Sequence, residues 1–177
     1  NHVHAHVYAN FINGRQPKAN SREQKAESRE LFPAISLVVS GGHTELFFMK
    51  NERSIQWISG TIDDAAGEAL DKTARLLGFE NRGGIAIEEA AKTHNSQQAS
   101  AIGLRLPRPL MHDDTLHFSF SGLKTAVLRA LKHYSNGSTG DDPNLKALFA
   151  YEIQEAITDV LVAKTVKALE QHNAQSI

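Results

Sequence analysis

Three histidines stand at alternate positions near the start of the chain, in NHVHAH, as His2, His4 and His6. Imidazole is the commonest metal ligand among side chains, so the spacing decides which of them can share one ion. On a strand all three would lie on one face, whereas on a helix only His2 and His6, four residues apart, would lie together. A pair at helical spacing needs a further ligand, often a carboxylate, with open positions left for a substrate. A histidine-rich surface segment without metal is the alternative.

A second candidate is VVSGGHTEL, in which an apolar strand runs into Ser40, Gly41 and Gly42. Two glycines remove Cβ atoms where a ligand can approach the backbone, and successive amides in such a turn can hold phosphate oxygens. The hydroxyls of Ser40 and Thr44 would add donors. Gly-Gly is also a common β-hairpin turn, and the local pattern alone favours a hairpin. His43 is a candidate ligand contact by its position beside Gly42.

Carboxylates line one side of the next segment, TIDDAAGEALDKTARLLG. Asp64, Glu68 and Asp71 recur at i, i+4 and i+7, opposite the apolar face of the helix that this segment predicts. Such carboxylates can accept hydrogen bonds from ribose hydroxyls, although a solvated face is the more ordinary interpretation. Gly67 within the helix costs about 1 kcal/mol relative to Ala, which indicates close approach by a ligand or another backbone.

A third segment, LHFSFSGLKTAV, alternates Phe118 and Phe120 with Ser119 and Ser121 before a helix begins. The start of a helix can bind an anion. The alternative, which the local pattern favours, is a plain strand-to-helix joint with Ser121 as the N-cap. Lys124 is either a phosphate contact or a surface lysine.

Apolar periodicity predicts the elements that position these groups. Residues 3–12 can form a helix, and 13–30 are polar enough for a solvated loop or insertion. The segments AISLVVS, HTELFFMK and SIQWISG predict a three-stranded meander. Further helices are expected over 64–77, 83–94, 121–134 and 145–172, with irregular structure over 98–120 and a loop over 135–144.

Local signals also predict where the 64–77 helix begins and ends. Thr61 and Asp64 have capping-box spacing, and Gly78 is the expected stop. Strands followed by helices indicate an α/β or α+β fold. The final HNAQSI is where a further strand could begin.

The composition excludes several classes of protein. The chain has 177 residues, 41% of them hydrophobic, which suits one domain or one lobe of a larger fold. Without cysteine there is no disulfide scaffold, zinc-thiolate site or thiol nucleophile. The net charge of -1 provides no global basic field, which leaves a local patch for RNA open. No apolar run approaches the roughly 20 residues that span a bilayer, and the start is no signal peptide.

Together, NHVHAH, LVVSGGHTEL, IDDAAGEALDKTARLLG and LHFSFSGLKTAV resemble in order and spacing the TsaD family, tRNA N6-threonylcarbamoyladenosine synthases formerly labelled O-sialoglycoprotein endopeptidases. The resemblance implies the two-lobed α/β fold of actin, sugar kinases and heat-shock chaperone ATPases (the ASKHA fold). It assigns residues 1–177 mainly to the second lobe, incomplete at both ends, with the insertion at about 13–30. The first lobe and a C-terminal stretch would be absent, so the chain is interpreted as a fragment.

The implied activity is transfer of a threonylcarbamoyl group from threonylcarbamoyl-AMP to N6 of the adenosine beside the anticodon, in tRNAs that read A-starting codons. The family needs no side-chain nucleophile, and its metal, iron or zinc, would sit on His2 and His6. Family ligand-binding positions match Val38, Val39, Ser40, Gly41, Gly42, Asp71 and Gly84, with His43 and Glu68 as further candidates. The implied partners are an ATP-type nucleotide, tRNA and accessory proteins, in the cytoplasm or a mitochondrion and away from membranes.

Departures and rival functions complete the expectations. Arg82 and Ile85 flank Gly83-Gly84, where family members commonly have prolines, and the third metal ligand, an Asp, would lie outside the chain. We therefore expect the isolated chain to be inactive. The alternatives are an ATPase or carbohydrate kinase of the same fold, a metallopeptidase, and a non-catalytic partner-binding lobe. FSFSGLKT argues against the kinase, and Val3 stands where a zincin needs glutamate.

Overall fold

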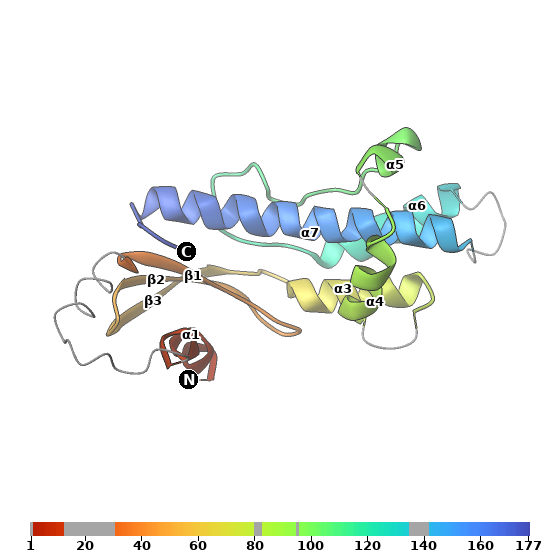
Figure 1. Ribbon diagram of the computed structural model, residues 1–177. Helices are drawn as coiled ribbons and strands as arrows, with labels where there is room; N and C mark the ends of the chain where they lie inside the picture. Colours follow the sequence, from red (N-terminus) through yellow and green to blue (C-terminus); the bar gives the residue numbers. More distant parts are fainter. Residues whose placement is uncertain (1, 13–30, 80–82, 95, 135–141) are drawn as a thin grey trace.

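A small antiparallel sheet lies between one short helix and one long helix (Figure 1). The structure is a computed structural model that describes residues 2–12, 31–79, 83–94, 96–134 and 142–177. The elements are α1 (His2–Ile12), β1 (Ala34–Val39), β2 (Thr44–Asn51), β3 (Ser54–Gly60), α3 (Ala66–Leu76), α4 (Gly83–Ala91), α5 (Ser96–Ala101), α6 (Ser121–Tyr134) and α7 (Pro143–Gln171). In the described part of the chain, no helix is both long and apolar enough to cross a membrane.

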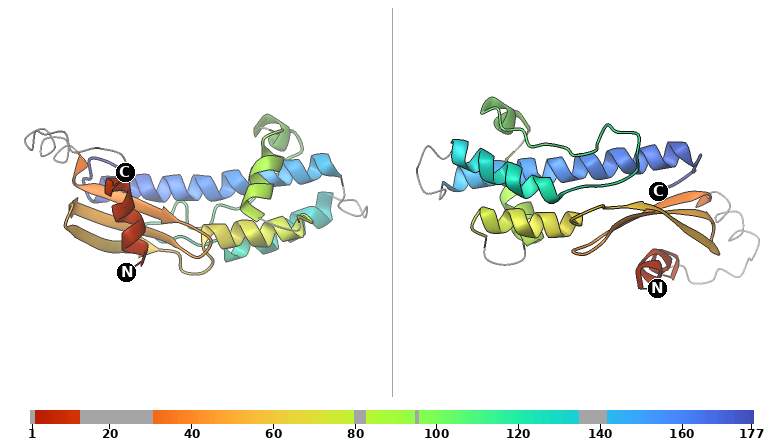
Figure 2. Two further views of the ribbon diagram at one scale, coloured as in Figure 1. Left: turned by 60° about the horizontal axis from the view of Figure 1, so that its bottom comes forward. Right: turned by 180° about the vertical axis from the view of Figure 1, so that it is seen from behind.

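The sheet confirms the predicted meander, with strand order β1-β2-β3. Because strand side chains alternate between faces, the sheet contributes to two cores. Ile35 and Leu46 join the large core with α7, whereas Phe47 and Met49 pack with residues of α1. Figure 2 shows α1 lying across the sheet, and α3, α4, α5 and α6 lying around the N-terminal half of α7. The fold is therefore α/β, as predicted.

Residues near the end of the chain pair with the free edge of β1. The amide of Ile35 donates to the carbonyl of Ser176 at 2.9 Å, and the amide of Gln175 donates to the carbonyl of Pro33 at 2.7 Å. Ser176 thus forms a parallel bridge with Ala34. This agrees with the expectation that strand structure begins in HNAQSI.

The predicted N-terminal helix is present and packs through its apolar stripe. Val3 and Val7, four residues apart, are buried against the sheet at 4% and 2% exposure. His2 and His6 are exposed, one position before each valine. The ring of His4 instead lies edge-on to that of Phe47, 5.5 Å away. The helical interpretation, with His4 on a different face, is confirmed; the predicted insertion at 13–30 lies outside the described residues.

The predicted capping box at the start of α3 is wrong. Thr61 Oγ1 donates to the carbonyl of Asp64 at 2.7 Å, and the N-cap residue Ala65 makes no side-chain cap. The amide of Ala66 donates instead to the buried hydroxyl of Thr44, at 2.9 Å. The cap comes from β2 because the β1–β2 turn packs against this end of the helix.

The predicted stop at Gly78 is confirmed. Gly78 has φ +80°, a conformation that glycine adopts without a Cβ penalty. Its amide donates to the carbonyl of Arg75, and the amide of Phe79 donates to the carbonyl of Ala74, both at 3.1 Å. This pair of bonds is a Schellman motif.

The remaining helices agree with the predictions at three places and differ at one. The structure has α4, α6 and α7 within two to three residues of the predicted segments. The difference is α5, which forms where 98–120 was predicted irregular; its Ala99 is buried at 2% exposure, so tertiary packing stabilises this short helix. Most of the loop predicted at 135–144 lies outside the described residues.

The irregular segment between α5 and α6 is fixed to α7 by charged side chains. Arg108 contacts Glu152, and its Nε donates to Asp159 at 3.0 Å. Fully buried Lys164 contacts Asp113 and lowers the pKa of that carboxyl group. These contacts give the segment a defined path, which brings it alongside the end of β3.

Candidate functional site

The Ser40–His43 turn is a hairpin turn, as the local pattern favoured. The amide of Ser40 donates to the carbonyl of His43 at 2.8 Å. Ser40 Oγ accepts the amides of Gly42 and His43 at 3.3 and 3.0 Å. These amides are therefore turned toward the serine rather than arranged as an open nest, and the hydroxyl of Thr44 is used as the cap of α3.

The two glycines of the turn leave open space above it. A Cβ built on Gly41 or Gly42 would meet nothing within 4 Å among the described atoms. Neither residue has a positive φ. Neither glycine is thus required by packing or by the turn conformation, and the surface of the turn is accessible to a ligand.

The backbone of the Ser40–His43 turn lies so close to Gly67 that no side chain fits at this position of α3. A Cβ on Gly67 would lie 2.6 Å from the carbonyl oxygen of Ser40 and 2.7 Å from Cα of Gly41. The amide of Gly67 donates to the same carbonyl at 3.2 Å. The predicted close approach is confirmed, and its partner is the turn. We call this contact of Ser40 and Gly41 with Gly67 the turn–helix contact.

Asp71 lies one helical turn beyond Gly67 on the same side of α3. A Cβ on Gly83 would lie 2.5 Å from Asp71 Oδ1 and 2.6 Å from Asp71 Cα, so α4 begins directly against this residue. A Cβ on Gly84 would make an ordinary contact, 3.8 Å from Leu70 Cδ1. The structure thus brings the β1–β2 turn, Asp71 and the glycine pair into one row.

The predicted acidic stripe divides into two parts. Lys72 donates to Asp64 at 2.7 Å and pairs with Glu68 at 2.9 Å. These hydrogen bonds raise the pKa of Lys72 above its ordinary value. Asp71 is exposed and forms no ion pair with any residue that the structure describes. Among the described residues, Asp71 is therefore the carboxylate of the stripe without an ion pair, whereas Glu68 is paired with Lys72.

Three imidazoles gather beside the turn. The rings of His2 and His6 lie 6.1 Å apart, and that of His43 lies 5.0 Å from His2. His43 Nδ1 is also 3.4 Å from Ser40 Oγ. A hollow of about 300 Å³ adjoins them; its lining comprises His6, Val7, Asn10, Ser36, Leu37, Val38, Val39, Ser40 and His43. His6, one of the two predicted metal ligands, therefore shares one hollow with the predicted ligand-binding residues Val38, Val39 and Ser40.

The exposed imidazoles of α1 could supply part of the predicted metal site. His2 and His6 are two exposed imidazoles on one helical face, a donor set that suits iron or zinc and leaves coordination positions open. Within the described ranges, no three His, Cys, Asp or Glu side chains form a metal-binding group. The pair fits part of a metal site, and the metal itself stays a prediction.

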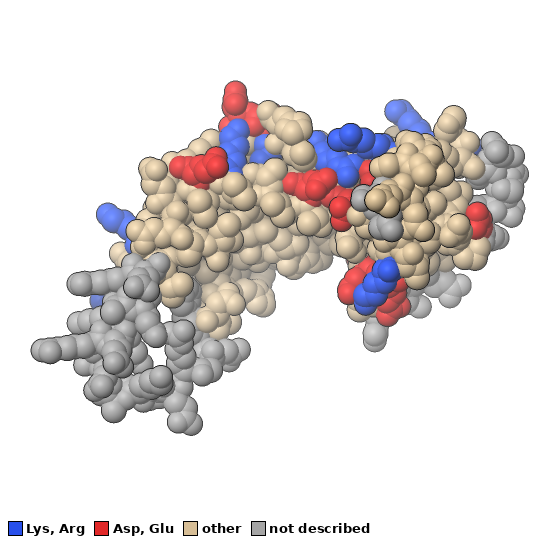
Figure 3. All heavy atoms as spheres, turned by 45° about the horizontal axis from the view of Figure 1, so that its top comes forward, with Lys and Arg blue, Asp and Glu red and all other residues tan. Residues whose placement is uncertain are grey.

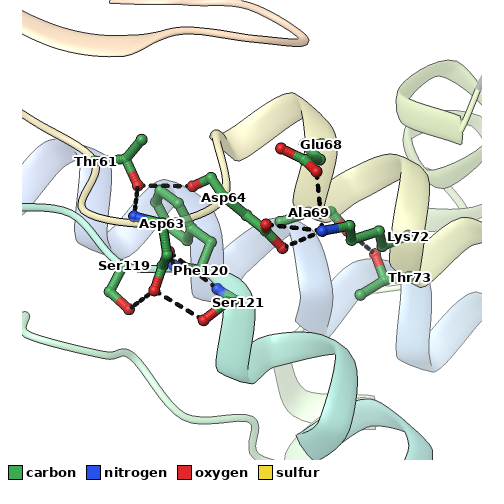
Figure 4. A network of polar contacts seen from close by, with 10 residues as sticks. All are labelled: Thr61, Asp63, Asp64, Glu68, Ala69, Lys72, Thr73, Ser119, Phe120 and Ser121. Carbon is green, nitrogen blue, oxygen red and sulfur yellow. Dashed lines mark hydrogen bonds and ion pairs between the residues drawn. The ribbon is translucent and has the colours of Figure 1, made fainter.

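Asp63 is a central residue that the sequence analysis missed (Figure 4). Its carboxylate accepts the hydroxyls of Ser119 and Ser121 at 2.6 and 2.8 Å, and the amides of Phe120 and Ser121 at 2.8 and 3.2 Å. Burial alone would raise the pKa of Asp63, but these hydrogen bonds lower it below the ordinary value. The start of α6 does bind an anion, and the anion is a side chain of the same protein.

This contact corrects the prediction that Ser121 is the N-cap. Its hydroxyl donates to Asp63 instead of accepting a helix amide. Next to it, Thr61 and Phe118 form a parallel bridge, which aligns the two segments. No local pattern could have identified the contact, because Asp63 and its partners are 56 to 58 residues apart in sequence.

Sequence comparison shows which known proteins this chain is similar to. A sequence model described as "TsaD: tRNA N6-adenosine threonylcarbamoyltransferase" matches residues 1–177. Proteins named tRNA N6-adenosine threonylcarbamoyltransferase are similar: that of Persephonella marina is 39% identical over 179 residues, with 99% of this chain and 44% of the relative covered. That of Syntrophomonas wolfei is 41% identical over 178 residues, covering 100% and 46%. That of Trichlorobacter lovleyi is 43% identical over 176 residues, covering 99% and 45%.

The chain spans slightly less than half the length of these curated relatives. The family match nevertheless extends over all of its residues, including every motif from the histidines to FSFSGLKT. The chain therefore belongs to the TsaD family of tRNA N6-adenosine threonylcarbamoyltransferases.

Proposed function

We propose that these residues are the central, ligand-holding part of a longer enzyme that modifies tRNA. The enzyme would transfer a threonylcarbamoyl group from threonylcarbamoyl-AMP to N6 of the adenosine beside the anticodon. The turn–helix contact is the observation that carries the proposal. It holds an accessible Ser-Gly-Gly turn at a fixed position between the histidine pair and Asp71.

The adenylate would lie along the row formed by the turn, α3 and the start of α4. Asp71 would accept hydrogen bonds from the ribose hydroxyls, and the backbone at Gly84 would lie beside the nucleoside. The hydroxyl of Ser40 and the surface of Gly41 and Gly42 would contact the acyl-phosphate end. Val38 and Val39 would line the adjoining hollow. Binding there orients the reactive carbonyl.

His2 and His6 would hold one divalent ion, iron or zinc, at the end of this hollow. Such an ion supplies a Lewis acid for the carbonyl of the substrate. The packing of Val3 and Val7 on the sheet fixes the position of both imidazoles. Because a mixed anhydride is already activated, transfer needs positioning and stabilisation of developing charge rather than a protein nucleophile.

The proposal extends to the full protein, its fold and its partners. The described α/β arrangement is compatible with a partial second lobe of an ASKHA-type enzyme. The full protein would act on tRNA in the cytoplasm or a mitochondrion, with accessory proteins that supply the adenylate.

The proposal is tested with the full-length protein that carries these residues. Unmodified tRNA is incubated with the protein, with and without the ATP-dependent supply of threonylcarbamoyl-AMP. The tRNA is then digested, and its nucleosides are separated and identified by mass spectrometry. We expect N6-threonylcarbamoyladenosine only when the adenylate is supplied. Sugar phosphorylation or peptide cleavage without tRNA modification would favour a rival activity.

A further inference from the structure

The exposed side of α6 is cationic and carries no acid. Three pairs of residues, one pair per helical turn, are exposed along this side: Lys124 and Thr125, Leu128 and Arg129, and Lys132 and His133. Residues 115–140 contain no Asp or Glu, although the whole chain has 20 of them and a net charge of -1. Lys124 and Lys132 are separated by eight residues, or about 12 Å along the helix axis. This face is thus a local basic patch in a nearly neutral chain.

Several cations elsewhere in the described structure are paired with acids, unlike those of α6. Lys72, Arg108 and Lys164 form ion pairs with acidic residues. Figure 3 shows the side of the molecule over α7, where acidic and basic side chains lie next to one another. By contrast, Lys124, Arg129 and Lys132 form no ion pair or hydrogen bond with any described residue. We call these three the α6 cations.

No described element covers this side of α6. Seen from behind, α6 lies in front of α7, with its outer side toward the viewer (Figure 2). Its opposite side packs inward through Leu123 and Val127, which are 1% and 0% exposed. Leu128, 39% exposed, is the single large apolar residue among the outward positions. A membrane-binding helix would need an apolar stripe as well as cations, so the patch fits a polyanion in water better than a lipid surface.

The patch begins close to the candidate site. Ser121, at the start of α6, is bound by Asp63 from the loop before α3. Gly67 then connects α3 to the Ser-Gly-Gly turn. The start of α6 is therefore linked to the turn by two directly contacting segments.

We propose that the α6 cations bind the sugar-phosphate backbone of tRNA. The inference rests on the proposed function, which makes tRNA the substrate. Exposed lysine and arginine side chains pair with phosphate oxygens without reading sequence. Their role would be to orient the tRNA so that its reactive adenosine reaches the adenylate.

The test uses the full-length protein and the triple variant Lys124→Gln/Arg129→Gln/Lys132→Gln. The affinity for unmodified tRNA is measured by filter binding at several salt concentrations. We expect a Kd about tenfold higher and a salt dependence shallower by roughly two to three units, because each lost phosphate contact removes about one. The KM for tRNA should rise, while the KM for threonylcarbamoyl-AMP stays unchanged.

A matched control removes the same charge from exposed cations elsewhere, in Lys50→Gln/Arg53→Gln/Arg105→Gln. This control variant should bind tRNA with nearly the same affinity as the unsubstituted protein. The proposal is overturned if the α6 triple variant binds tRNA normally, or if both triple variants weaken binding equally. Loss of binding to an acidic accessory protein with normal tRNA affinity would overturn it too. Failure of the unsubstituted protein to modify tRNA would instead reject the proposed function.

Discussion

At the scale of single residues, the site depends on glycines, which have no side chain, as much as on its polar side chains. The contact of Gly67 with Ser40 and Gly41 exists because Gly67 has no Cβ. The energetic cost of a mid-helix glycine predicted a close approach, and the structure identifies its partner as the Ser40–Gly41 backbone. Asp63 was missed because its partners come from a distant segment, which no spacing rule links to it.

Substituting Gly67 by Ala tests the turn–helix contact. Alanine normally stabilises a helix interior by about 1 kcal/mol relative to glycine. At Gly67 the new methyl group would overlap the backbone of Ser40 and Gly41, so we expect a loss of about 1–3 kcal/mol in the free energy of unfolding. Affinity for the adenylate should fall as well.

Gly122→Ala in α6 is the matched control, because a Cβ there would meet nothing within 4 Å. Urea unfolding and calorimetric titration of both full-length variants measure the two effects. Equal stability of Gly67→Ala and Gly122→Ala would contradict the importance of the contact.

Substituting histidines of α1 tests the metal assignment. His2→Ala and His6→Ala should each lower the metal content of the full-length protein, because one imidazole of the pair is lost. His4→Ala should retain the metal, since His4 lies against Phe47 instead. Elemental analysis of the purified proteins decides the point: full metal content in the His2→Ala/His6→Ala double variant would remove the assignment.

The carboxylate of Asp63 predicts a pH dependence of stability. Its pKa in the folded protein is lowered, so the stabilisation is present above its unfolded value of about 3.9 and is lost as the pH falls through the folded value. We expect Asp63→Asn to lower the free energy of unfolding at neutral pH by at most about 1 kcal/mol. An amide cannot accept all four hydrogen bonds, but Asp63 is exposed, so solvent screens each of them. Below about pH 4 the difference between the variant and the original protein should shrink. A difference in the free energy of unfolding between the two proteins that stays constant from pH 3 to 7 would refute this.

At the scale of elements, the periodicity of apolar residues correctly predicted which segments form helices and which form strands. The apolar spacing of α1, α3, α6 and α7 and the alternation of β1, β2 and β3 are visible in the sequence, and their types were correct. The ends of helices were less predictable. The cap of α3 comes from Thr44 and that of α6 from Asp63, so each depends on tertiary packing. α5 depends on packing in the same way.

The segment between α5 and α6 should depend on the buried lysine of α7. Lys164 is fully buried and contacts Asp113, with its amine 2.8 Å from the carbonyl oxygen of Thr115. Lys164→Met should leave both groups without their cation and lower the midpoint of thermal unfolding by several degrees.

Lys167→Met is the control for this change. Lys167 binds the same segment through the carbonyl of Asp113, at 2.6 Å, but its side chain is partly exposed. It should therefore cost less stability. An equal or larger shift for Lys167→Met, measured by scanning calorimetry, would contradict the assigned role of Lys164.

At the scale of the whole molecule, residues from separate segments of the chain lie around one turn. The order of those motifs indicated the family before any geometry was known, and the family match extends over all 177 residues. The positions of the motifs relative to one another could not be predicted, because strand pairing and helix packing determine them. The structure arranges the histidine pair, the turn, Asp71 and the glycine pair as neighbours.

The most direct test of the central claim is the yield of N6-threonylcarbamoyladenosine in tRNA, measured by mass spectrometry with threonylcarbamoyl-AMP supplied to the full-length protein. We predict modification by the original protein and by Gly122→Ala, and a raised KM for the adenylate in Gly67→Ala. No modified nucleoside from the original protein, or an unchanged KM in Gly67→Ala, would contradict the claim that the turn–helix contact holds the adenylate for transfer to tRNA.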